Sequence, residues 1–277
     1  MSEQSPNPVQ SPVLPPPTAN RWRRRGIQVL IGLLLLAAPA WWLTGCVADA
    51  REASHRSSCK CWLKQYGLAM HNYHDTYGSF PPAFVLGPNG QKWHSWRVLL
   101  LPFFEQSELY AEYRFDEPWD GPNNRKLLAK MPEIFACPSQ PCPTRKAVLL
   151  SIGVLGCSGS GPAAEGGFTS YAAVLGQDCA FRGAVPVSIK EITDGTSNTV
   201  LIGECTRMKI PWTKPDDIDT AFYSKLGDPD GFGSPHEGGG AHFLMGDGSV
   251  RFLNAMLPQA TVDALFTRNG GETVNDF

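Results

Sequence analysis

The chain has 277 residues, with 24 lysines and arginines, 26 aspartates and glutamates and a formal net charge of -2. A nucleic-acid-binding protein needs a basic face, and these charges are spread along the chain, so nucleic acid is not expected as a partner. The 28 glycines and 24 prolines predict many turns between short strands, with helix confined to a few segments.

The first 25 residues are predicted to form a disordered cytoplasmic tail, because the Pro- and Ser-rich stretch at 1–20 lacks the large apolar side chains of a folded core. The next stretch, Gly26–Val47, carries no formal charge and is long enough as a helix to span a bilayer. Four arginines directly precede it, and positive residues favour the cytoplasmic side. We therefore expect a single-pass protein of the cell membrane, with its N-terminus cytoplasmic and an extracytoplasmic domain at 48–277.

Three kinds of N-terminal signal are compatible with this stretch to different degrees. We favour an uncleaved signal anchor, which needs only apolar length and flanking charge. The run Leu43–Cys46 also matches the lipobox of lipoproteins, in which Cys46 would be acylated and become the new N-terminus. A prepilin leader would need a Glu five residues after the processed glycine, and the five residues after Gly26 contain no carboxylate. This difference counts against polymerisation into a pilin filament.

An apolar stripe at helical spacing follows the anchor. Its members recur every three or four residues: Cys59, Leu63, Tyr66, Met70, Tyr73 and Tyr77. Gly78 and the prolines at 81 and 82 predict the end of this helix, so a single helix should run from the membrane into the globular domain. His71 and His74 have a spacing compatible with a metal site, although such histidines are more often surface or capping residues.

Eight cysteines in a chain exported to an oxidising compartment predict disulfide bonds. Seven of them follow the apolar stretch, so at least one thiol stays unpaired, and the connectivity is left open. Cys59 and Cys61 lie on different faces of a helix and are not expected to pair. Cys137 and Cys142 either close a small ring or each reach elsewhere, and their spacing does not favour a zinc motif.

The middle of the chain is predicted to hold short elements between polar turns. Helices are expected at 107–113 and 124–130, strands at 171–175 and 199–203, and a buried apolar run at 96–101. The Gly-rich stretch 153–167 is predicted to be a flexible loop, and Ser158 within it lacks the glycine pattern of a nucleophile elbow. Since no nucleophile, base and orienting group occur together at a readable spacing, no enzymatic activity is expected.

Near the C-terminus, a hairpin turn is predicted at Asp247 and Gly248, between apolar runs at 241–245 and 249–253. His236 is expected at the entry to this hairpin, where its side chain would bond the turn or a backbone carbonyl.

The competing interpretation of this region is a calcium site. Its candidate oxygen donors are Asp228, Asp230 and Asp247. The spacing is a poor match to an EF-hand loop, which would need ligands where Phe232 and Gly239 stand. No other metal and no cofactor is predicted.

Several sequence blocks, in the same order, resemble one large family. They are LKQYGLAMHNYHDTYGSFPPA, WRVLLLPFFEQSELY, EPWDGPNN, FACPS, TSYAAVLG, ITDGTSNTVLIGE and DGSVRFL. Together they make 48–277 similar to the domain of unknown function 1559 family, whose members have a prepilin-type leader and a C-terminal motif of His, nine residues and Asp-Gly. Here the leader is degenerate, and ten residues separate His236 from Asp247. The resemblance implies a pilin-like α+β fold, a long N-terminal helix packed on an antiparallel sheet with loop-rich insertions, and no known reaction.

The preferred function is therefore a non-enzymatic structural or interaction protein of the cell envelope, with the bilayer and other envelope, secretion or pilus-like components as partners. The alternative is an extracytoplasmic module, in lipoprotein form if Cys46 is acylated, that binds glycan or peptide on exposed tryptophans. Its candidate residues are Trp93, Trp96, Trp119 and Trp212. A hydrolase is the least favoured class.

Overall fold

The structure, a computed structural model, describes residues 19–139, 167–206 and 208–274, apart from Ser224, Pro229, Glu237 and Thr273. Within these ranges the side chains of 19–24, 33–46, Ala48 and Tyr223 are not described. The predicted loop at 153–167 lies outside the described residues up to position 166, Ser158 included, and so do Cys142 and Cys157. The chain separates into two compact units, Met1–Arg51 and Glu52–Phe277.

Helix α1 (Ala19–Tyr77) has 59 residues, and its first part makes up the described portion of the first unit. Among the residues that the structure describes, no helix combines the length and the mean hydropathy of a membrane span. The side chains in the middle of the predicted anchor, that of Cys46 included, belong to the part that is not described.

The C-terminal part of α1 is the predicted stem of the second unit, and its apolar stripe is confirmed. Leu63, Tyr66 and Met70 are fully buried, whereas Leu68, on the opposite face, is 63% exposed. The stripe ends before Tyr77, which is 62% exposed. As predicted, the helix stops there, and the backbone N–H of Gly78 donates to the carbonyl of His74 at 2.7 Å.

The main sheet has five strands in the order β7-β4-β5-β8-β9. These are β4 (Tyr171–Leu175), β5 (Val200–Glu204), β7 (Ile218–Asp219), β8 (Gly240–Met245) and β9 (Val250–Asn254). All neighbours are antiparallel except β4 and β7. Two small antiparallel sheets pair β1 (Phe84–Leu86) with β2 (Lys92–Ser95), and β3 (Phe168–Thr169) with β6 (Ile210–Pro211). The expected mixture of helix and mainly antiparallel sheet is therefore confirmed.

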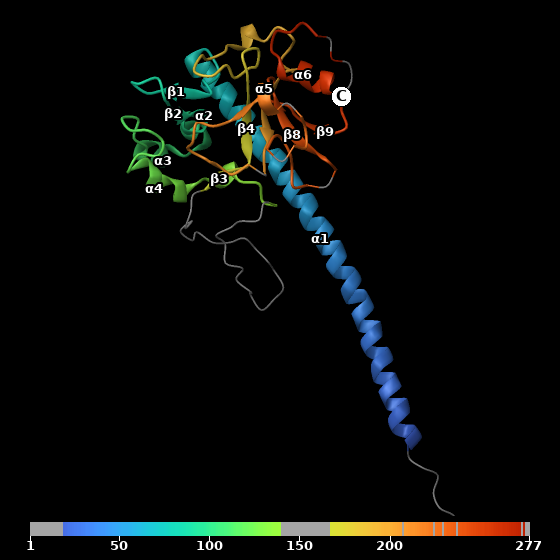
Figure 1. Ribbon diagram of the computed structural model, residues 1–277. Coiled ribbons are helices and arrows are strands. Elements are labelled where there is room, and N and C mark those ends of the chain that lie inside the picture. The colour runs from blue at the N-terminus through green and yellow to red at the C-terminus, as the bar shows by residue number, and fades with distance from the viewer. Residues whose placement is uncertain are drawn as a thin grey trace, which may run out of the picture. The chain divides into compact units, whose positions relative to one another are not determined.

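Alternate side chains of the central strands point to two different cores, as the pleat of a strand requires. Tyr171 and Ala173 of β4 pack with the buried stripe of α1, which passes behind β4 and β8 in Figure 1. Ala172 and Val174 belong to the second core, which α6 (Gln259–Phe266) covers. The sheet is thus buried on both faces.

Short helices fill the connections. They are α2 (Trp96–Leu99), α3 (Ser107–Glu112), α4 (Asn124–Leu127) and α5 (Thr220–Tyr223), with 3-10 turns η1 (Leu101–Phe104), η2 (Leu128–Lys130), η3 (Glu133–Phe135) and η4 (Ile189–Glu191). The helices predicted at 107–113 and 124–130 are confirmed as α3 and as α4 with η2. The apolar run at 96–101 is buried as predicted, apart from the half-buried Leu99, but the chain continues helically through Pro102, which occupies an early position of η1 where its missing N–H costs nothing.

A buried ion pair joins α2 to the sheet. The Arg97 guanidinium lies 2.7 Å from Asp217 Oδ1 and also donates to the carbonyl of Tyr171 at 2.8 Å. Asp217 in turn accepts from the backbone N–H of Ala173 and from Trp96 Nε1. Burial raises the pKa of the Asp217 carboxyl, although Arg97 lowers it. The pair therefore fixes the start of β7 beside β4 at the cost of desolvating two charges.

The predicted hairpin turn between β8 and β9 is also confirmed. Gly248 has a φ of 81°, and Asp247 Oδ1 accepts from the backbone N–H of Ser249 at 2.8 Å. The turn lies against α1, because a Cβ added to Gly67 would be only 3.1 Å from Gly248 Cα. Glycine at both positions allows the backbones of helix and turn to approach this closely.

Replacing Asp217 with Ala should leave the Arg97 charge buried without its partner and lower the free energy of unfolding by about 3–5 kcal/mol. The matched control is Glu112→Ala, which removes an exposed ion pair with Lys130 and should cost less than about 1 kcal/mol. Urea unfolding of the full chain in detergent, followed by circular dichroism, measures both. Equal losses for the two variants would contradict a structural role for the buried pair.

Replacing Gly248 with Ala should lower the free energy of unfolding by about 1–3 kcal/mol, because a side chain at this positive φ is strained. Gly233→Ala is the control, since a Cβ there meets no atom within 4 Å. Thermal unfolding of both variants tests this, and a Gly248→Ala protein as stable as the control would show that the turn adapts without strain.

Candidate functional site

Three reactive side chains from distant parts of the chain meet at one buried point. Cys59 lies on the buried stripe of α1, one turn before Leu63. Cys137 follows η3, and its backbone N–H donates to Ser170 Oγ at 2.8 Å, which ties this loop to the start of β4. His236 lies in the loop before β8. Within the described residues, these three form the one group of at least three His, Cys, Asp or Glu side chains whose ligand atoms converge.

The three side chains are close enough to share a ligand. Cys59 Sγ and Cys137 Sγ are 2.9 Å apart, and both cysteines are free thiols. His236 Nε2 lies 3.3 Å from Cys59 Sγ and 3.6 Å from Cys137 Sγ. All three residues are buried, with exposed fractions of 0%, 2% and 4%. We call this group the Cys-His centre.

A carboxylate holds the imidazole in place from its other side. Glu52, about two turns of helix before Cys59, bonds His236 Nδ1 through one carboxylate oxygen. Its other oxygen accepts from Ser139 Oγ at 3.0 Å, two residues after Cys137. With Nδ1 engaged by the carboxylate, Nε2 is the nitrogen that faces the two sulfurs.

The charges of the centre are strongly coupled. The hydrogen bond from Cys59 lowers the pKa of Cys137 to about 6, with further lowering by His236. The same bond, together with burial, raises the pKa of Cys59. Burial lowers the pKa of His236, but its bonds to Cys137 and Glu52 outweigh this and raise the pKa to about 9. Near neutral pH the centre therefore favours a Cys137 thiolate beside a His236 imidazolium.

Another carboxylate, this one fully buried, lies near the centre. Glu204 is fully buried, and its charge raises the pKa of both Cys59 and His236. Its Oε2 accepts from the backbone N–H of His242 at 2.8 Å. Among the described residues, Glu204 Oε1 has no hydrogen-bond partner.

The prediction for His236 was only partly right. Its backbone N–H bonds Ser234 Oγ close to the hairpin, as an entry position suggests, but its side chain reaches Glu52 and the two cysteines rather than the turn or a backbone carbonyl. The turn residue Asp247 is exposed and bonds its own turn. The signature residues His236 and Asp247 thus serve separate ends of the hairpin.

The structure does not bring the calcium candidates together. Within the part of the chain that it describes, Asp228, Asp230 and Asp247 form no cluster of converging ligand atoms. Asp228 Oδ1 accepts from the backbone N–H of Asp230, which is an ordinary turn contact. His74 Nε2 accepts from the backbone N–H of Ile189, so it caps η4, as the more common interpretation of this histidine expected.

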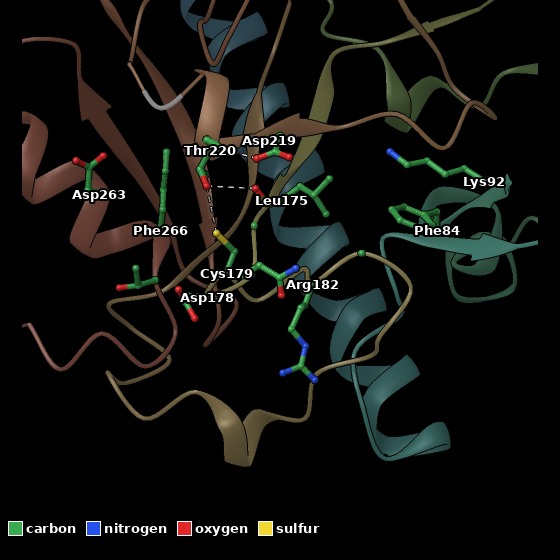
Figure 2. A pocket seen from close by; sticks show the side chains of 15 residues that line it. Phe84, Lys92, Leu175, Asp178, Cys179, Arg182, Asp219, Thr220, Asp263 and Phe266 are labelled. Atoms are coloured by element: carbon green, nitrogen blue, oxygen red, sulfur yellow. Dashed lines mark hydrogen bonds between the residues drawn. The ribbon is translucent and has the colours of Figure 1, made fainter. Parts of the chain in front are cut away.

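A separate cleft of about 700 Å³ lies beyond the end of β4 (Figure 2). In its lining, Cys179 Sγ lies 3.7 Å from Thr220 Oγ1, and the Thr220 hydroxyl donates to the carbonyl of Leu175. Burial raises the pKa of Cys179 to about 11, so its thiol stays neutral. The charged lining of the cleft is mixed, because it contains Lys92 and Arg182 as well as three aspartates. The cleft is therefore a weaker candidate site than the Cys-His centre, where three reactive side chains converge.

The fold defines the class of the protein as an α+β domain with a long N-terminal helix against a mainly antiparallel sheet. The chain belongs to the family described as protein of unknown function (DUF1559), whose model matches residues 48–225 and 212–259. The match covers the C-terminal part of α1, the sheet and the Cys-His centre together with Glu52, and it confirms the resemblance found in the sequence blocks. No curated protein and no solved structure matches the chain.

Alkylation of the reduced, native full chain should separate the thiols by burial. Cys61 is exposed on α1 and should react at the rate of a solvent-exposed thiol. Cys59 and Cys137 should react at least about tenfold more slowly until the protein is denatured. Peptide mapping by mass spectrometry after timed iodoacetamide treatment reports each cysteine separately. Similar rates for Cys59 and Cys61 would contradict the burial of the centre.

Proposed function

We propose that this protein is a non-enzymatic, membrane-anchored component of the cell envelope, with a pilin-like domain held on the extracytoplasmic side. The observation that carries the proposal is the surface of α1 within the predicted anchor. Ile27, Val29, Leu30 and Ile31 are all more than half exposed. These positions point in different directions around a helix, so exposed apolar side chains lie on more than one face of it, as in a lipid-facing segment.

The stem helix supports the same function. One helix contains both the predicted anchor and the buried stripe that packs against the sheet. The arginines before Gly26 favour a cytoplasmic N-terminus, and the long-helix-on-sheet arrangement of the second unit is the one expected for a pilin-like protein. Partners are then the bilayer and other components of the envelope or of a secretion or pilus-like apparatus.

The buried position of the Cys-His centre favours a structural over a catalytic role. Cys59 and Cys137 are at most 2% exposed, so a substrate larger than an ion has no direct path to the sulfurs in this conformation. The glycan or peptide platform is less well supported, because Trp96 and Trp212 are fully buried and only Trp93 and Trp119 are partly exposed.

Anchoring can be tested with the full chain carrying a C-terminal tag in a bacterial host. The protein should stay with the membranes after alkaline carbonate extraction, and protease added to spheroplasts should digest the C-terminal domain. A Leu34→Arg, Leu35→Arg double variant should be released or fail to be exported, because each central arginine costs about 2.5–3.5 kcal/mol in a bilayer. Cys46→Ser is the matched control if the segment is a signal anchor.

Mass spectrometry of the mature N-terminus distinguishes the forms of anchor. An intact tail supports the signal anchor, and an acylated Cys46 supports the lipoprotein form. A wild-type chain recovered in the cytosolic fraction and shielded from external protease would overturn the proposal.

A further inference from the structure

We propose that Cys59, Cys137 and His236 bind a divalent transition-metal ion that prefers thiolate and imidazole ligands, with zinc as the best fit. Two sulfurs and one imidazole nitrogen form a donor set typical of zinc sites with three protein ligands. The residues come from the stem helix, the loop after η3 and the loop before β8. An ion held here would therefore join the stem helix to two loops of the domain. The inference does not depend on the proposed function.

The distances fit a tetrahedral ion after a small adjustment. With metal–sulfur bonds of about 2.3 Å and metal–nitrogen bonds of about 2.0–2.1 Å, a sulfur and a nitrogen ligand lie roughly 3.5 Å apart and two sulfurs roughly 3.8 Å apart. The two sulfur–nitrogen distances are 3.3 and 3.6 Å. The sulfur–sulfur distance is 2.9 Å, so the sulfurs would have to separate by about 1 Å, which a small rotation of either cysteine side chain provides.

The surroundings of His236 favour ligation over packing alone. Its Nδ1 is bonded to the Glu52 carboxylate, which leaves Nε2 as the nitrogen that faces the sulfurs. Metal-binding histidines almost always have such a carboxylate or carbonyl partner, because it fixes the tautomer and strengthens the donor nitrogen. The Ser139 hydroxyl donates a hydrogen bond to the other oxygen of the same carboxylate.

The charge balance also suits a buried site. A divalent ion with two thiolates and a neutral imidazole has no net charge, so the ion would leave no uncompensated charge in a region from which water is largely excluded. The fourth position of a tetrahedral ion is left for a water molecule.

The competing interpretation is a structural disulfide between Cys59 and Cys137. Its formation would transfer two electrons from the thiols to an external thiol oxidant and release two protons. A disulfide would hold the stem to the loop after η3 equally well. It would not explain why an imidazole nitrogen lies at ligand distance from both sulfurs, or why a carboxylate holds that imidazole.

Metal binding is tested on the full chain in detergent, reduced, freed of metal with a chelator and then titrated with zinc or cobalt. The wild type should bind about one ion per chain by elemental analysis, and bound cobalt should show sulfur-to-metal charge-transfer bands and the visible bands of tetrahedral coordination. Cys59→Ser, Cys137→Ser and His236→Ala should each weaken binding at least tenfold or abolish it. Glu52→Gln should weaken it by about 10–100-fold while keeping the fold, since this side chain is partly exposed.

The matched controls are Cys61→Ser, two residues from Cys59 but exposed, and Cys205→Ser, buried but not one of the converging ligand residues; both should bind as the wild type does. Circular dichroism separates loss of the site from loss of the fold, and Glu52→Gln keeps the test valid if a cysteine variant does not fold. Wild-type protein that binds no more metal than Cys137→Ser would overturn the proposal. So would protein purified from the cell without metal and with Cys59 and Cys137 joined as a disulfide.

Discussion

The second unit depends on burying one stripe of the stem helix against the sheet. Leu63, Tyr66 and Met70 are fully buried there, and burying side chains of this size stabilises a fold by about 1.5–3 kcal/mol each. The same stripe carries Cys59 one turn earlier. The contact that builds the first core therefore also fixes the position of the Cys59 thiol beside the loops that carry Cys137 and His236. Core packing and the Cys-His centre therefore share one helix face.

Specific polar contacts position the parts around this core, because apolar packing alone does not fix the orientation of the groups that it buries. On one side of the sheet, Arg97 and Asp217 place β7 beside β4. On another, Glu52 orients His236 towards the sulfurs. Both contacts join residues that are more than a hundred positions apart in the chain. In both, a buried charge is tolerated because its partner carries the opposite charge. The domain thus combines a nonspecific apolar core with a few specific ionic contacts.

The local elements could largely be predicted because their signals lie within a few residues of one another. The helical stripe, the end of the stem at Tyr77 and the Asp247-Gly248 turn each follow from spacing or from backbone preference, and each is found. The run at 96–101 was less predictable, because Pro102 stops a helix in its interior but is accepted at the start of η1. The Cys-His centre could not be predicted, since Cys59, Cys137 and His236 lie at least 78 positions apart in the chain and no local spacing links them.

By itself, the sequence determined the family, the class of fold, the stem stripe and the apolar, arginine-flanked stretch, because periodicity, composition and short motifs record local physics directly. Only the tertiary structure decided that Cys59 meets Cys137 and His236, and that Glu52 holds the imidazole. The reason is physical: contacts between residues 78 to 184 positions apart depend on how the helix, loops and sheet pack, and no local spacing encodes that packing.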